Sequence, residues 1–239
     1  MKIQHIEGKI YIIDDLMSSE QINTFNQNLT DQIKWQTDLD SGTSVMRYDF
    51  YKRLNINSIY EQFQFTSIER ENKEIEDKGD SQINSDLSHI VYYPLLSWAL
   101  QEGFLLKSEN IIRCKVNLQT RASESARNKF NTPHCDLGPN ASEDYLTALY
   151  YVNDSDGDTY FFNEDYDYVN NINNLNNLSV LTKIPAKGGR LVIFPNNIAH
   201  AGSHPVDSDY RMVINYNFYP TRWFDFGKYE EQKIQNSNL

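Results

Sequence analysis

The segment that decides the fold reads RLVIFPNNIAHAGSHPVDSDYRMVINYNFY and covers residues 190–219. It contains three short apolar runs, residues 190–194, 198–201 and 211–219, separated by Pro, Asn, Gly and Ser, which favour turns. In the last run, side chains alternate between the two faces of a strand, so Arg211, Asn215 and Asn217 share one face. That polar face predicts either a strand that lines a pocket or an edge strand with one wet face.

Five more strands are predicted upstream, at residues 111–119, 130–136, 146–152, 159–163 and 179–184. Eight short strands separated by turn residues predict a mainly β fold with a jelly-roll core. Asp154, Asp156 and Asp158 are spaced like calcium ligands, but Thr159 stands where a calcium loop needs glycine. We therefore predict a hairpin turn at Asp156-Gly157.

The first half of the chain is predicted to add helices that flank this core. A strand at residues 9–13 precedes a Ser18-x-x-Gln21 capping box and a helix to about Leu29. Residues 86–102 have helical spacing, with Pro94 as a kink or a new helix start and Gly103 as a stop. The charged run 69–80 is predicted to be an exposed helix or loop. Residues 1–105 are thus an N-terminal extension packed on a core at 106–222, with a tail at 223–239, in one structural domain.

Composition and charge indicate which partners and which cellular location suit this chain. The 239 residues carry a net charge of −11, which argues against nucleic acid as a partner, because phosphate binding needs clustered Lys and Arg. The N-terminus lacks the pattern of a signal peptide, and no apolar run reaches transmembrane length. Two cysteines give no disulfide framework. These features predict a cytoplasmic protein without membrane contact, and the abundance of Asn, Ile and Tyr is typical of an AT-rich viral or bacterial genome.

The candidate chemistry begins at His134-Cys135-Asp136. Strand alternation turns His134 and Asp136 to one side and Cys135 to the other, where its thiol packs instead of reacting. With His200 as a third ligand, two imidazoles and one carboxylate form the facial triad of non-heme Fe(II). Zinc held by His200 and His204 is disfavoured, because the glycine and proline beside them argue against a helix. Arg211 offers a fixed cation to a carboxylate.

These motifs resemble the 2-oxoglutarate and Fe(II)-dependent oxygenases, in their prolyl 4-hydroxylase-like branch, from about residue 111 to 218. The family's His-x-Asp matches His134 and Asp136, its distal His matches His200 in "HAGSHP", and its last-strand cation matches Arg211. The segments "TALYYVND", "GDTYFF" and "PAKGGRLVIFP" are similar to family strands and turns. The resemblance implies a double-stranded β-helix (jelly roll) core.

It also implies the ligands and their roles. Fe(II) is held by the triad, with 2-oxoglutarate and O2 as co-substrates. Arg211 and Tyr151 bind the distal carboxylate of 2-oxoglutarate, and Asn117 is a further contact to the co-substrate. The implied reaction couples decarboxylation of 2-oxoglutarate to succinate with hydroxylation of a C–H bond in a protein or peptide, prolyl or other, or in a small molecule.

Three questions stay open at this point. The alternative function is a catalytically silent jelly-roll binding protein, against which the complete triad and Arg211 argue. The polar insertion 121–129 before the first ligands departs from the family pattern and is a candidate specificity element. The Asn- and Tyr-rich segment 165–177 is either a surface insertion or a lid over the substrate.

Overall fold

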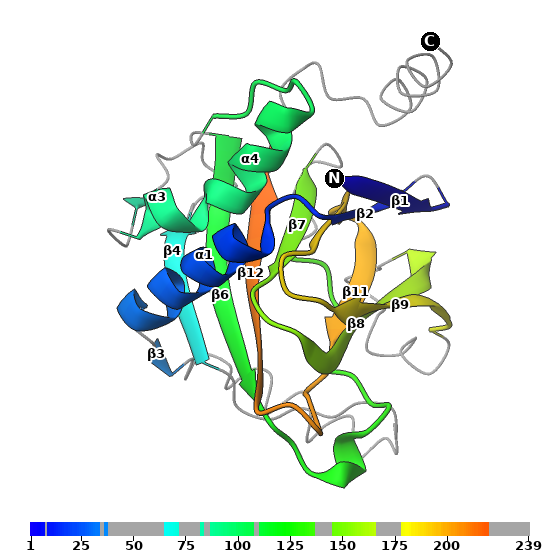
Figure 1. The fold of residues 1–239 in the computed structure, drawn as a ribbon. Helices are drawn as coiled ribbons and strands as arrows, with labels where there is room; N and C mark the ends of the chain where they lie inside the picture. Colours follow the sequence, from blue (N-terminus) through cyan, green and yellow to red (C-terminus); the bar gives the residue numbers. More distant parts are fainter. Residues whose placement is uncertain are drawn as a thin grey trace.

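Two antiparallel sheets form the core of the protein in the computed structural model (Figure 1). The structure describes residues 1–7, 9–33, 36–37, 65–71, 82–83, 87–107, 110–136, 145–165 and 178–219. The larger sheet has the order β1 (Lys2–Ile6), β2 (Ile10–Asp14), β10 (Leu191–Pro195), β7 (Leu146–Tyr151), β12 (Tyr210–Phe218), β6 (Ile111–Thr120), β4 (Phe65–Glu71) and β3 (Gln36–Thr37), with β5 (Gln82–Ile83) on β4. The smaller sheet has the order β11 (Ile198–Gly202), β8 (Ser155–Asp165) and β9 (Val180–Ala186). The predicted mainly β, jelly-roll fold is confirmed.

Helices cover one face of the larger sheet, and the smaller sheet faces the other (Figure 1). The helices are α1 (Ser19–Gln32), α3 (Ser88–Val91) and α4 (Tyr93–Gln101). Leu29, Leu95 and Trp98 pack with Ile214 and Tyr216, which lie on the apolar face of β12. A second core between the sheets is built from Ile10, Ile12, Leu149, Tyr151, Phe161, Ile184, Ala186, Val192, Phe194 and Val213. The alternation of β12 therefore separates a helix-packing face from a face turned toward the smaller sheet.

Local signals set the ends of the helices as predicted. At the start of α1, the backbone amide of Gln21 donates to Ser18 Oγ (3.2 Å), and the backbone amide of Ser18 donates to Gln21 Oε1 (2.9 Å). The predicted helix 86–102 is two helices, and Pro94 lies in the first turn of the second, where its missing N–H costs nothing. Gly103 ends α4 with a φ of +80°.

Two predictions about strands were wrong. Residues 130–136 are not a regular strand: the segment contains isolated bridges, such as that between His134 and His200, and a bend at Asp136. Asp156-Gly157 is not a hairpin turn, because both residues lie inside β8, and β7 and β8 belong to different sheets. The physical reason is tertiary: the carboxylate of Asp156 binds a distant loop, and Gly157 packs directly against Arg211.

The N-terminal part contributes more strand than predicted. β1 and β2 extend one end of the larger sheet, and β4 pairs with β6 at the other. Residues 69–71 of the charged run belong to β4 instead of a helix or loop, because pairing with β5 and β6 orders them.

Residues 72–80, 166–177 and the tail 223–239 lie outside the described residues. The domain boundaries at 105/106 and 222/223 remain predictions. In the part of the chain that the structure describes, no helix combines the length and hydrophobicity needed to cross a membrane.

Candidate metal centre

His134, Asp136 and His200 meet at one point, with one ligand atom from each within 4.8 Å of the others. His200 Nε2 lies 3.6 Å from Asp136 Oδ2, and His134 Nε2 lies 3.9 Å from Asp136 Oδ1. The two imidazole centroids are 4.9 Å apart. The structure thus brings together the three residues that the sequence singled out, although the segment that carries the first two is not a regular strand.

Backbone contacts orient both imidazoles. His134 and His200 exchange two backbone hydrogen bonds of 3.0 Å, which fix one histidine opposite the other. The Nδ1 of His134 contacts the carbonyl of Thr132 (2.9 Å), and that of His200 contacts the carbonyl of Ile198 (3.2 Å). When Nδ1 donates its proton to a carbonyl, Nε2 keeps the lone pair that binds a metal.

Two amides hold the carboxylate of Asp136. Asn215 Nδ2 donates to Oδ1 (2.9 Å) and Oδ2 (3.0 Å), and Asn217 Nδ2 donates to Oδ2 (3.3 Å). The Arg113 guanidinium donates to the backbone carbonyl of Asp136 (3.0 Å). Burial opposes ionisation of Asp136, but the neighbouring charges of His200 and Arg113 and the Asn215 hydrogen bond outweigh it. The pKa of this carboxyl group therefore lies well below its usual range.

The protonation states suit a divalent metal. Burial lowers the pKa of His200 to about 4, so its imidazole is neutral at pH 7. A neutral imidazole and an ionised carboxylate are the forms that bind metals, and two histidines with one carboxylate favour Fe(II) with open positions. His204 does not belong to this group, since its Nδ1 contacts the carbonyl of Thr120 instead (3.3 Å).

A buried cation lies on the same face of β12 as the two asparagines. Arg211 is 5% exposed, and its guanidinium donates to Gly157 O (Nε, 2.8 Å), Gln119 Oε1 (Nη1, 2.7 Å) and Thr159 Oγ1 (Nη2, 2.8 Å). All three acceptors are uncharged, and Arg211 forms no ion pair among the described residues. Burial lowers the pKa of Arg211, and its neighbours offset only part of that effect. A buried guanidinium whose hydrogen bonds all go to uncharged acceptors can bind a carboxylate strongly.

Tyr151 completes the surroundings of Arg211. Its hydroxyl donates to Thr159 Oγ1 (2.6 Å), and the Arg211 guanidinium carbon lies 5.6 Å from the centre of its ring. Burial raises the pKa of Tyr151, so its phenol stays protonated and able to donate. Tyr151 belongs to the core between the two sheets, where it packs with residues of the smaller sheet such as Phe161 and Ile184.

Asn117 lies on β6 directly opposite Val213 of β12, and so on the face of the larger sheet that is turned toward the smaller sheet. Its Oδ1 is buried without a hydrogen-bond partner among the described residues. No hydrogen bond joins it to Arg211 or Asp136 in the described structure, so its contact with the co-substrate remains a prediction. Cys135 is buried and is not among the three residues of the metal group.

Sequence reasoning missed the residues that support Asp136 and Arg211. Asn215 and Asn217 gave a signal, because they share the polar face of β12 with Arg211. Gln119 and Thr159 gave none, since their contact with Arg211 depends on strand register and on the packing of two sheets.

The sequence from 120 to 219 matches the profile of the 2OG-Fe(II) oxygenase superfamily. No curated protein sequence matches the chain. Among solved structures, the non-heme alpha ketoglutarate dependent carbocyclase SnoK from nogalamycin biosynthesis is 12% identical, with a TM-score of 0.54 over 89% of this chain and 80% of that chain. A 2OG-Fe(II) oxygenase family oxidoreductase from Burkholderia pseudomallei is 13% identical, with a TM-score of 0.54 over 89% and 86%.

The epimerase SnoN, solved in complex with Fe3+, alpha ketoglutarate and nogalamycin RO, is 11% identical, with a TM-score of 0.54 over 89% of this chain and 79% of that chain. At these identities the structural similarity establishes the fold. The segment that matches the superfamily profile contains the triad and Arg211.

Proposed function

We propose that the protein is a 2OG-Fe(II) oxygenase that hydroxylates C–H bonds, because residues 120–219 match the profile of the 2OG-Fe(II) oxygenase superfamily. Enzymes of this class are dioxygenases that use Fe(II), 2-oxoglutarate and O2. The single observation that carries the proposal is the triad of His134, Asp136 and His200 in a form suited to Fe(II). A bound Fe(II) supplies the chemistry that decarboxylates 2-oxoglutarate and transfers one oxygen atom from O2 to the substrate.

The residues of the chain bind and orient the reactants. Arg211 holds the distal carboxylate of 2-oxoglutarate through charge-assisted hydrogen bonds. Tyr151 and Thr159 form the neutral side of this carboxylate site, and Asn117 is a further contact to the co-substrate. Phe161 and Phe194 flank His200 and exclude water from the metal, with Phe194 at a ring-centre distance of 4.8 Å.

The overall reaction is balanced: substrate, 2-oxoglutarate and O2 give hydroxylated substrate, succinate and CO2. We propose a protein or peptide, prolyl residues included, or a small molecule as substrate. Nucleic acid is disfavoured by the net charge of −11. The cytoplasm is the proposed location.

The test starts with the purified full chain under anaerobic conditions. Addition of Fe(II) and then 2-oxoglutarate should produce a weak visible charge-transfer band, and admission of O2 should produce succinate. A chain that gives neither band nor succinate is the silent jelly-roll binding protein instead. Mass spectrometry of lysate proteins and metabolites, with active enzyme and with the His134→Ala variant, then finds the molecule that gains one oxygen atom.

A further inference from the structure

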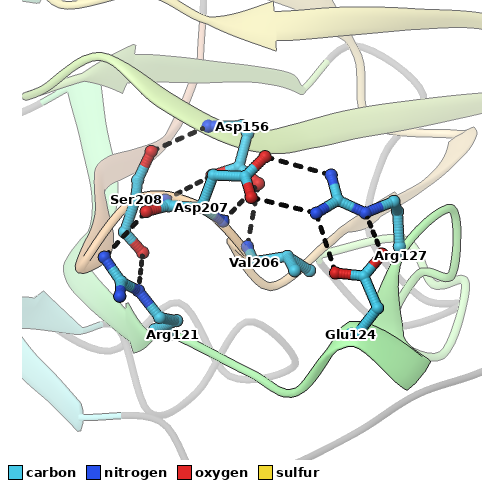
Figure 2. Close-up of polar contacts among 7 residues, drawn as sticks. All are labelled: Arg121, Glu124, Arg127, Asp156, Val206, Asp207 and Ser208. Atoms are coloured by element: carbon cyan, nitrogen blue, oxygen red, sulfur yellow. Dashed lines mark hydrogen bonds and ion pairs between the residues drawn. The ribbon is translucent and has the colours of Figure 1, made fainter.

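The first residues of β8 form hydrogen bonds with residues 206–208, in the loop that precedes Arg211. The carboxylate of Asp156 accepts three consecutive backbone N–H groups, from Val206 (2.8 Å) and Asp207 (2.9 Å) on Oδ2 and from Ser208 (2.8 Å) on Oδ1 (Figure 2). The hydroxyl of Ser208 in turn accepts the backbone N–H of Asp156 (3.2 Å). One side chain therefore sets the conformation of this turn.

The next residues of β8 hold the same loop and the arginine itself. The carbonyl of Gly157 accepts Arg211 Nε (2.8 Å), and the carbonyl of Asp158 accepts the backbone N–H of Ser203 (2.9 Å). A Cβ atom at Gly157 would lie 2.7 Å from both Arg211 Cδ and Ser203 O, so the two segments touch without a gap. A shift of the 206–208 turn would therefore be transmitted to Arg211.

The insertion 121–129 contacts the outer side of this turn. Arg127 lies between Glu124 and Asp207, at 2.9 Å from Asp207 Oδ1 (Figure 2). Arg121 donates to the backbone carbonyls of Asp207 (2.7 Å) and Ser208 (3.2 Å). The Arg127 ion pairs are solvent-exposed, and such pairs contribute little on their own. The insertion thus lines the outside of the turn, whereas Asp156 fixes its backbone from the β8 side.

Electrostatics favour the charged form of Asp156 in this position. Desolvation opposes its ionisation, but the backbone N–H groups of residues 206–208 outweigh this and hold the pKa of the carboxyl group well below its usual range. The carboxylate is therefore ionised at neutral pH, when it forms its strongest hydrogen bonds.

We infer that Asp156 is a positioning residue for 2-oxoglutarate: by fixing the 206–208 turn on β8, it holds Arg211 in the orientation that receives the distal carboxylate. This inference rests on the proposed role of Arg211. An arginine side chain has several rotatable bonds, and holding it in place before binding removes an entropic cost from co-substrate binding. Asp156 acts through the turn and Gly157, without touching the co-substrate.

The experiment compares Asp156→Ala with Asp154→Ala in the full chain. Asp154 lies two residues away and accepts the backbone N–H of Gly188 (2.7 Å), so it is a matched carboxylate outside the 206–208 turn. Anaerobic titration of the Fe(II)-loaded proteins with 2-oxoglutarate gives the Kd from the visible band. Mn(II) binding to the metal-free proteins gives the metal affinity, and hydrogen exchange at residues 206–208 reports on the turn.

Asp156→Ala should raise the Kd for 2-oxoglutarate about tenfold, the effect of about one charge-assisted hydrogen bond. Exchange at residues 206–208 should accelerate, while Mn(II) affinity stays unchanged and Asp154→Ala behaves like the parent. If Asp156→Ala does not fold, Asp156→Asn decides, since its one carbonyl oxygen should give a smaller rise in Kd. An unchanged Kd with a loosened turn would overturn the inference, as would equal losses of metal and co-substrate. Arg211→Met is titrated in parallel: an unchanged Kd in that variant would refute the role of Arg211 itself, whereas a raised Kd in Arg211→Met beside an unchanged Kd in Asp156→Ala would refute the inference about Asp156 alone.

Discussion

The side-chain amide of Asn215 donates to both carboxylate oxygens of Asp136, at 2.9 and 3.0 Å. Asn215 lies four residues after Arg211 on β12 and on the same face, so one strand positions both a candidate metal ligand and the candidate co-substrate cation. The amide holds the plane of the carboxylate, which determines where the lone pairs of its oxygens point. A metal ligand oriented in this way loses no rotational freedom when the metal binds.

Replacing Asn215 with alanine should therefore weaken metal binding by about 10- to 100-fold, the range for residues that orient a metal ligand. Mn(II) titration of the metal-free protein measures this directly. Asn163→Ala is the control. Asn163 lies in an exposed part of β8 and its amide donates to Ser179, so this substitution should leave the Mn(II) affinity unchanged. Equal Mn(II) affinities of Asn215→Ala and the parent would show that the amide does not orient Asp136.

His134→Ala and Arg211→Met should separate the two parts of the site. Loss of an imidazole ligand should abolish Mn(II) binding, and with it the 2-oxoglutarate band. Arg211→Met should retain Mn(II) binding but raise the Kd for 2-oxoglutarate about 100-fold, because a charge-assisted contact contributes roughly 1.5 to 3 kcal/mol. Calorimetry with Mn(II) followed by 2-oxoglutarate measures both. Loss of metal binding in Arg211→Met would contradict this separation.

Much of the fold could be predicted from the sequence because its signals are local. The alternation of β12 and the capping box of α1 depend on neighbours within a few residues. The three metal-site residues could be selected because His134 and Asp136 are two apart and His200 follows a clear strand.

The rest depends on contacts between distant segments. Asp156-Gly157 has the local signal of a hairpin, yet hydrogen bonds to residues about 50 positions away keep it in a strand. Residues 130–136 look like a strand, but they form isolated bridges, such as that between His134 and His200, and no continuous ladder. Thr159 and Gln119 join Arg211 only through the pairing and packing of strands, which a single sequence does not specify.

Gly157→Ala should damage the co-substrate site, because the new Cβ would lie 2.7 Å from Arg211 Cδ and Ser203 O. We expect a loss of about 1 to 3 kcal/mol in the free energy of unfolding, as for overpacked sites, with a weaker 2-oxoglutarate band. Gly188→Ala is the matched control, since its Cβ would meet backbone atoms at an ordinary 3.5 Å. Urea unfolding and 2-oxoglutarate titration measure both effects. Equal stability of the two variants would contradict the close contact at Gly157.

The ion pair between Asp14 and Arg190 should make stability depend on pH. Arg190 donates to both oxygens of Asp14, at 2.9 and 2.8 Å, and joins β2 to the residue that precedes β10. The Arg190 hydrogen bonds hold the pKa of Asp14 below its ordinary value of 3.8. A carboxyl group whose pKa falls on folding stabilises the folded state above the unfolded pKa and loses that effect as pH drops through the folded pKa.

Asp14→Asn should therefore cost about 2 to 3 kcal/mol at pH 7, because it leaves the largely buried Arg190 without its charged partner. The difference from the parent should shrink as the pH falls below about 4, where the unfolded chain begins to take up a proton at Asp14, and it should be lost as the pH drops through the lower pKa of the folded state. Asp15→Asn is the control: Asp15 pairs only with exposed Lys2 in the described structure, and asparagine tolerates its φ of 58°. Urea unfolding at pH 7, 4 and 3 measures all three proteins. A cost for Asp14→Asn that stays constant across this range would mean that the contact acts through packing instead of charge.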